Sequence, residues 1–210
     1  MSVPDIPCNR HRRLRNCRSG SFSWVVESVD VKRRSARREA IMILPKVRDP
    51  RMVTVRRGGT LTDEDHQLLA LWAAECAEHV LGYFEREQPD DPRPRDAIAA
   101  ARAWACGDVP MMQARAVGGH AMGAARFLTG AARFAAYSAG QAACVGHVAE
   151  HDLGAAAYAI KATRSARPDD PAAGRVERDW QRDQLALPIR QLVLDDQTRR
   201  DAICWSVFCD

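Results

Sequence analysis

The sequence predicts an all-α protein: an alanine-rich bundle of about five to six helices, preceded by a basic N-terminal leader. Between residues 97 and 166, 25 of the 70 positions are Ala, the residue that costs the least free energy to hold in a helix. Apolar residues also recur at spacings of three and four, which is the period of one helix face. With 210 residues, the chain can bury a core without disulfide or metal staples.

Residues 1–50 differ from the rest of the chain in charge. They hold 12 Lys and Arg against 5 Asp and Glu, a net charge of +7, whereas the other 160 residues hold 19 against 22, a net charge of −3. We expect this leader to be mostly disordered, because arginine pairs interrupt any apolar period. Met42 and Met52 are alternative translation starts, so it stays open whether residues 1–50 are made.

Residues 51–61 are expected to form an extended arm and a turn, because Gly58-Gly59 is a turn pattern. The first helix should then run from Thr62 to about Gln88. Thr62 is a favourable N-cap, and three acidic residues follow it at the positive end of the helix dipole. Its apolar face consists of Leu69, Trp72, Cys76, Val80 and Tyr83.

Two shorter helices are expected next. The second spans about residues 93–106 and ends at Gly107, where a C′ glycine belongs. Asp108 should cap the third helix, which has Pro110 in its first turn and Phe127 on its apolar face. Thr129-Gly130 then marks a soft break.

The most regular periodicity of the chain follows this break. It predicts one long helix over about residues 131–166, with a kink at Gly140, Gly146 or Gly154 as an open alternative. The apolar seam consists of Phe134, Tyr137, Gln141, Cys144, Val148, His151, Ala155, Tyr158 and Ala162.

The remaining helices follow the prolines at residues 168 and 171. One should span about residues 172–185, and the last should run from Ile189 to about Phe208. This last segment is too apolar for a free tail. We therefore expect residues 167–210 to dock on the bundle formed by residues 62–166.

The cysteines and the hydropathy indicate a reduced, soluble environment. Seven cysteines are an odd number, and none forms a C-x-x-C pair, which favours buried thiols in a cytosol. No stretch approaches about 18 apolar residues, and the polar N-terminus has no signal-peptide pattern. We expect a cytoplasmic protein that contacts no membrane.

One motif suggests metal chemistry. His147-Val148-Ala149-Glu150-His151 fits H-x-x-E-H, and on a helix both imidazoles could hold one Zn²⁺ while Glu150 activates a water. The inverzincin proteases with this pattern need a further carboxylate ligand, farther downstream than the 59 residues left after His151. We therefore interpret His147 and His151 as partly buried residues hydrogen-bonded to the backbone or to neighbours such as Gln141. A noncatalytic metal site, completed by His120 or His79, stays as the alternative.

Other catalytic patterns are incomplete. Cys8-x-x-His11 with Cys17 is half of a zinc knuckle, and its other half is missing. Glu75 and Glu78, beside Cys76 and His79, resemble di-iron ligands, but a second E-x-x-H is missing. The sequence has neither G-x-S-x-G nor a glycine-rich phosphate loop. We expect no catalytic residues and no cofactor.

Three acidic stretches are candidates for binding a basic partner, although such stretches are usually only solvated helix faces. They are Asp63-Glu64-Asp65, Glu177-Arg178-Asp179 and Asp195-Asp196.

A string of helical signatures between residues 62 and 165 resembles the immunity proteins of the bacterial immunity-protein-five-like helical domain family. The signatures are Thr62–His66, Leu69–Ala77, Asp90–Pro94, Ala99–Trp104, Ala139–Ala142 and His147–Ala156. The resemblance implies a cytoplasmic, non-catalytic protein that binds a cognate toxin and blocks its active site or substrate entry. Two alternatives remain: a metal-binding protein or enzyme using His147 and His151, and nonspecific nucleic-acid binding through the basic leader.

Overall fold

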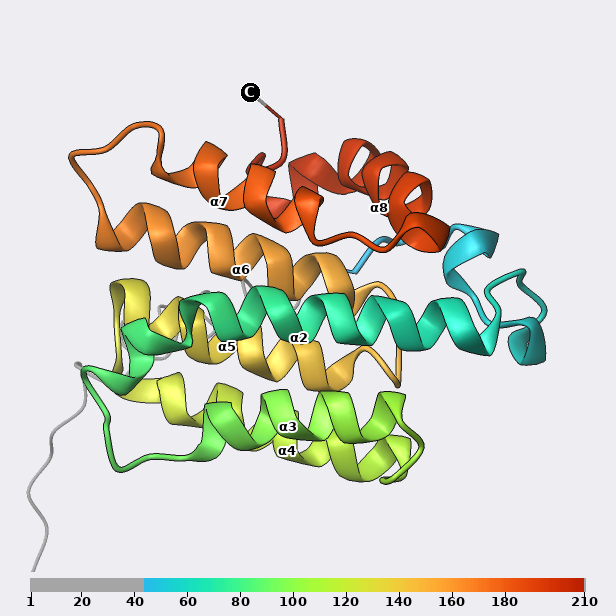
Figure 1. The fold of residues 1–210 in the computed structure, drawn as a ribbon, viewed down its shortest axis with the longest axis horizontal. Coiled ribbons are helices and arrows are strands. Elements are labelled where there is room, and N and C mark those ends of the chain that lie inside the picture. Colours follow the sequence, from blue (N-terminus) through green and yellow to red (C-terminus); the bar gives the residue numbers. More distant parts are fainter. Residues whose placement is uncertain (1–43, 210) are drawn as a thin grey trace, which may run out of the picture. The chain divides into compact units, whose positions relative to one another are not determined.

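The computed structural model describes residues 44–209 (Figure 1). The alternative start at Met42, the half zinc knuckle at residues 8–17 and the predicted disordered leader as far as residue 43 lie outside the described residues. Residues 44–50, which the prediction counted with the leader, are described, and Asp49 is buried among them. Within residues 44–209 the chain forms seven α-helices and no strand, which confirms the all-α prediction with one helix more than expected. The helices are α2 (Asp63–Glu85), α3 (Arg93–Ala105), α4 (Met111–Ala124), α5 (Gly130–Cys144), α6 (His151–Ala166), α7 (Ala173–Asp183) and α8 (Leu187–Arg200).

Helix α5 lies at the centre of the bundle and packs against α2, α3, α4 and α6. Figure 1 shows α3 and α4 below α2 and α5, and α7 and α8 above α6. Six of the ten buried residues of α5 are Ala, so its neighbours approach closely. A Cβ atom on Gly118 of α4 would lie only 2.6 Å from the carbonyl oxygen of Gly140 in α5. Small residues therefore set the distance between these two helices.

The predicted long helix over residues 131–166 is wrong, because the chain folds back at residues 145–150. Helices α5 and α6 pack against each other as a hairpin. A straight helix of this length would extend about 54 Å and would leave much of its apolar surface without a partner. The apolar period continues through the break because both helices face the same core.

Helix ends follow the capping prediction in part. Thr62 Oγ1 accepts a hydrogen bond from the backbone N–H of Asp65 at 3.0 Å, and Gly107 has the positive φ (83°) of a C′ glycine. Asp108, however, does not cap α4, which begins after Pro110 without a side-chain cap. Phe127, expected on an apolar face, is 91% exposed in a 3₁₀ turn that follows α4.

Residues 51–61, expected to form an extended arm and a turn, form short turns. Two 3₁₀ turns, Pro50–Met52 and Val55–Arg57, are joined to Leu61 by an isolated bridge from Thr54. Asp49 caps the first turn by accepting a hydrogen bond from the backbone N–H of Arg51 at 2.8 Å. Met52 is fully buried, so ordered packing begins before residue 52.

The C-terminal segment ends its helix earlier than predicted. Helix α8 stops at Arg200, a 3₁₀ turn (Asp201–Cys204) follows, and Trp205 takes a left-handed conformation that a continuing helix forbids. Val207 and Phe208 are nevertheless buried. Among residues 44–209, no helix has the length and apolarity that a membrane crossing requires.

Candidate functional site at the α5–α6 turn

The H-x-x-E-H motif lies at the turn between α5 and α6. His147 belongs to the turn, whereas His151 is the first residue of α6. The two imidazoles therefore do not share one helix face, as the zinc hypothesis requires. They still line one cavity of about 510 Å³, together with Cys144 and residues of α4.

His151 is held by a hydrogen bond that the sequence analysis anticipated. Its Nδ1 lies 2.6 Å from Oε1 of Gln141, so Nδ1 donates and carries the proton. Gly154 leaves room for this pair, because a Cβ atom there would lie 2.5 Å from Gln141 Oε1. Burial, together with His147 and the nearby arginines, lowers the pKa of His151 to about 4. His151 is therefore neutral at pH 7.

His147 lies in positive surroundings. Arg57 donates a long hydrogen bond of 3.5 Å to the backbone carbonyl of His147, while the ring Nδ1 is buried and has no hydrogen-bond partner among the described residues. The pKa of His147 is lowered first by burial and then by Arg115, Arg57 and Arg48. Two arginines from the segment before α2 and one from α4 thus act on one imidazole.

A second cavity, of about 480 Å³, opens on the other side of His147. Its wall contains His66, whose Nε2 lies 2.8 Å from the carbonyl oxygen of Val145 and donates to it. The edge of the His66 ring packs on Trp104 at a centroid distance of 4.8 Å. Trp104 also needs a glycine at position 146, because a Cβ atom there would lie 2.6 Å from its ring.

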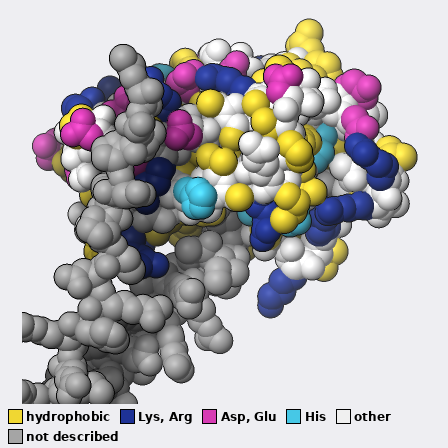
Figure 2. All heavy atoms as spheres, turned by 90° about the horizontal axis from the view of Figure 1, so that it is seen from below, with side chains coloured by type: hydrophobic (Ala, Val, Ile, Leu, Met, Phe, Trp, Pro, Cys, Tyr) yellow, Lys and Arg dark blue, Asp and Glu magenta, His cyan; other side chains and the backbone are white. Residues whose placement is uncertain are grey.

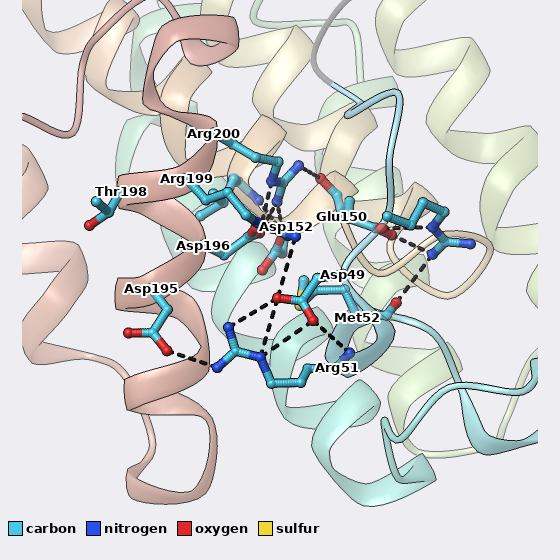
Figure 3. A network of polar contacts seen from close by, with 12 residues as sticks. Asp49, Arg51, Met52, Glu150, Asp152, Asp195, Asp196, Thr198, Arg199 and Arg200 are labelled. Atoms are coloured by element: carbon cyan, nitrogen blue, oxygen red, sulfur yellow. Dashed lines mark hydrogen bonds and ion pairs between the residues drawn. The ribbon is translucent and has the colours of Figure 1, made fainter.

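The inner side of the turn contains a buried ionic network (Figure 3). Arg200 is 1% exposed, and it pairs with the fully buried carboxylates of Asp152 (3.0 Å) and Asp196. Its Nη1 also donates to the backbone carbonyl of Glu150 at 2.8 Å. Burial raises the pKa of Asp152 to about 7, and Arg200 opposes this rise.

The segment before α2 joins the same network. Arg48 Nε donates to the fully buried carboxylate of Glu150 at 2.6 Å. Asp49 pairs with Arg199 at 3.3 Å, and Arg51 pairs with Asp195 at 2.8 Å. Glu150, the residue proposed to activate a water in a zinc site, is therefore a buried ion-pair partner.

Two of the acidic candidate stretches are largely internal, which corrects the prediction of solvated faces. Glu177 is 3% exposed and Asp196 is fully buried. Asp195 is partly exposed and bound to Arg51, and Asp63 is exposed and bound to Arg56 at 2.7 Å. The carboxylates expected to attract a basic partner mostly neutralise arginines or histidines of the chain itself.

The α2 residues that resemble di-iron ligands are likewise engaged in contacts within the chain. His79 Nδ1 lies 2.9 Å from the carboxylate of Glu177, and its ring stacks on Trp180 at 3.7 Å. Glu78 pairs with Arg102 of α3. These contacts join α2 to α3 and α7.

The cysteines and histidines of residues 44–209 nowhere form a group of three or more metal-binding side chains with each other or with carboxylates. Cys76, Cys144 and Cys204 are buried, and burial raises the pKa of each thiol. Cys106, expected inside a helix, is exposed at the end of α3.

Sequence reasoning missed the arginines and Trp104 as components of this site. Arg48 and Arg57 lie in the segment before α2, more than 50 residues from Arg115 in α4, and no local pattern connects them. The position of Arg115 within an otherwise mostly apolar helix was the available signal.

One comparison with known proteins gives a match. The family model described as Imm-5 like putative immunity protein matches residues 59–187, more than half of the chain. The matched stretch contains the α5–α6 turn, but it ends at the first residue of α8. No curated protein and no solved structure matches the chain.

Proposed function

The chain belongs to the Imm-5 like putative immunity protein family, and on this basis we propose that it neutralises a cognate bacterial toxin by binding it directly in the cytoplasm, without catalysis. The observation that carries this proposal is the surface on both sides of His147 and Val148, which line both cavities. Arg57 and Arg115 lie there with no acidic partner among residues 44–209. Exposed cations beside apolar side chains are a surface suited to recognising a partner.

The contacts of the motif residues favour binding over catalysis. Glu150 is fully buried and paired with Arg48, so it would have to break an ion pair before accepting a proton from water. His151 uses Nδ1 for Gln141 and keeps only Nε2 for another partner. Glu150 is therefore not placed to activate a metal-bound water, as a metalloprotease mechanism requires. This ion pair counts against the alternative of an enzyme using His147 and His151, although the contact of His151 with Gln141 is compatible with a metal ligand.

The experiment that tests the proposal uses the full chain, tagged and purified from its native host. A co-purifying protein is identified by mass spectrometry and then expressed alone in a neutral bacterial strain. We expect this protein to arrest growth when expressed alone, and co-expression of the chain to restore growth.

The matched control for growth is a chain shortened to residues 1–150, which lacks α6 and cannot fold the bundle. If the co-purifying protein does not arrest growth, or if the intact chain restores growth no better than this control, the immunity function is contradicted.

A further inference from the structure

We propose that the surface around the α5–α6 turn binds an acidic protein segment that also carries an apolar side chain. The turn surface, as we call it, consists of the residues that line the two cavities beside His147. This inference rests on the proposed function, because it assigns the place and the chemistry of toxin recognition. It also reverses the polarity expected from the sequence, which offered acidic stretches for a basic partner.

The turn surface is positively charged. Four arginines and one acidic residue, Asp63, line the two cavities. Two of the arginines already have partners: Arg48 binds Glu150, and Arg56 binds Asp63. The other two, Arg57 and Arg115, are exposed and have no acidic partner among residues 44–209. Because residues 51–210 carry a net charge of −3, this positive surface contrasts with its surroundings.

Apolar side chains line the same two cavities as Arg57 and Arg115. Met111 lines one cavity, Met112 and Met122 line the other, and Val148 lines both. Met112 is 53% exposed. Methionine is unbranched and adapts to irregular partners, so such a groove accepts an aliphatic or aromatic side chain. Figure 2 shows the side on which α3 and α4 lie, with hydrophobic side chains gathered on it and Lys and Arg side chains beside them.

The charge and the apolar groove together favour a protein segment over a nucleic acid. Binding to a phosphate backbone gains affinity from many cations that follow the strand. Here each of the two cavities has one arginine without an acidic partner among residues 44–209, Arg57 in one and Arg115 in the other, beside apolar side chains. An Asp or Glu next to a large apolar residue matches this arrangement, because its carboxylate can pair with a guanidinium while its neighbour fills the groove.

The test uses a random peptide library of 12 residues, displayed on phage and selected against the full chain. We expect the selected peptides to be acidic and to contain a large apolar residue. Their binding should fall at least tenfold in the double variant Arg57→Glu/Arg115→Glu. The control variant is Arg126→Glu/Arg175→Glu, which changes the net charge equally at exposed arginines outside both cavities and should bind as the native chain does.

Three results would overturn the inference. The first is selection of peptides without an acidic preference, or of none at all. The second is equal binding by the two double variants. The third is tight binding of a fluorescent 20-nucleotide single strand of RNA or DNA that is lost only in Arg57→Glu/Arg115→Glu, which would assign the turn surface to nucleic acid.

Growth rescue separates this inference from the proposed function. If the toxin is neutralised by both double variants, the immunity function stands and the turn surface is not the toxin site. If the intact chain itself fails to rescue growth, the proposed function fails, whatever the peptides show. We expect rescue by the native chain and by Arg126→Glu/Arg175→Glu, and loss of rescue in Arg57→Glu/Arg115→Glu.

Discussion

The two sides of the α5–α6 turn use arginine in opposite ways. On the inner side, Arg200 is buried between the carboxylates of Asp152 and Asp196. On the outer side, Arg57 and Arg115 are exposed beside two cavities and lack an acidic partner among the described residues. The inner arginine stabilises the fold through buried ion pairs, whereas the outer arginines form no ion pair with the described residues and are available to a partner.

The inner network also joins residues inside and outside the stretch that matches the family model. Arg48 and Arg200 lie outside the stretch that matches the family model, whereas Glu150 and Asp152 lie inside it. The ion pairs therefore attach the segment before α2 and helix α8 to the family region. Because these charges are removed from water, the network stabilises the fold only while every member keeps its partner.

The largest expected effect comes from breaking this network with Arg200→Met. The variant leaves the buried carboxylate of Asp152 without a cation and leaves Asp196 with Arg199 alone. Removing one partner of a buried ion pair costs about 3–5 kcal/mol. Urea denaturation followed by circular dichroism measures the free energy of unfolding. We expect a loss in this range.

Arg199→Met is the matched control, because Arg199 also binds Asp196 but its side chain is 37% exposed. The free energy of unfolding of Arg199→Met should fall by about 1 kcal/mol or less, as for partly exposed ion pairs. The triple variant Arg200→Met/Asp152→Asn/Asp196→Asn should recover part of the lost stability, since it removes the unpaired charges. Equal losses for Arg200→Met and Arg199→Met would contradict the assigned role of the network.

An intermediate effect is expected at His151, which lies where the two sides meet. Its pKa is lowered from 6.5 to about 4 in the folded chain, so between these values the unfolded chain binds a proton that the folded chain does not. Stability is therefore lost as the pH falls from 6.5 towards 4. From pH 7 to pH 5, the native chain should lose about 2 kcal/mol more than the variant His151→Gln.

Comparing the pH dependence of stability in the native chain and in His151→Gln isolates the contribution of His151 from those of its neighbours. Asp152 has a raised pKa and acts with the opposite sign, because its stabilising proton is lost as the pH rises towards 7. His147 has a lowered pKa and acts in the same direction as His151. Both residues are present in both proteins, so their contributions cancel. Identical pH dependence of the two proteins would show that His151 is not desolvated as the structure indicates.

The fold was largely predictable, because local physical rules decide most of it. Thr62 and Gly107 mark helix ends through side-chain capping and a left-handed conformation, and both rules act within a few residues. The break at residues 145–150 was predicted only as an open alternative, a kink at Gly146. The apolar period runs through it unchanged, and only the packing of α5 on α6 decides that the chain turns there.

The site was predictable only where its contacts are local. The hydrogen bond between His151 and Gln141 joins residues ten apart, and the sequence analysis named Gln141 as a neighbour. The pairing of Glu150 with Arg48 joins residues 102 positions apart, and no sequence pattern predicts it. Which charges remain unpaired depends on such distant contacts, so the sequence offered acidic stretches and did not indicate the exposed arginines of the turn surface.

The smallest expected effect on stability is that of Arg57→Glu/Arg115→Glu, the variant that should abolish binding to the turn surface. Neither arginine has an ion-pair partner among residues 44–209, and exposed substitutions of this kind usually change stability by less than about 0.5 kcal/mol. Thermal and urea unfolding of the variant should match those of Arg126→Glu/Arg175→Glu. A loss above about 1 kcal/mol would show that the outer arginines also support the fold, since at exposed positions only a structural contact reaches that size. Unchanged stability with lost peptide binding would show that the outer arginines serve recognition and not folding. Arg200→Met, in contrast, should lower the free energy of unfolding.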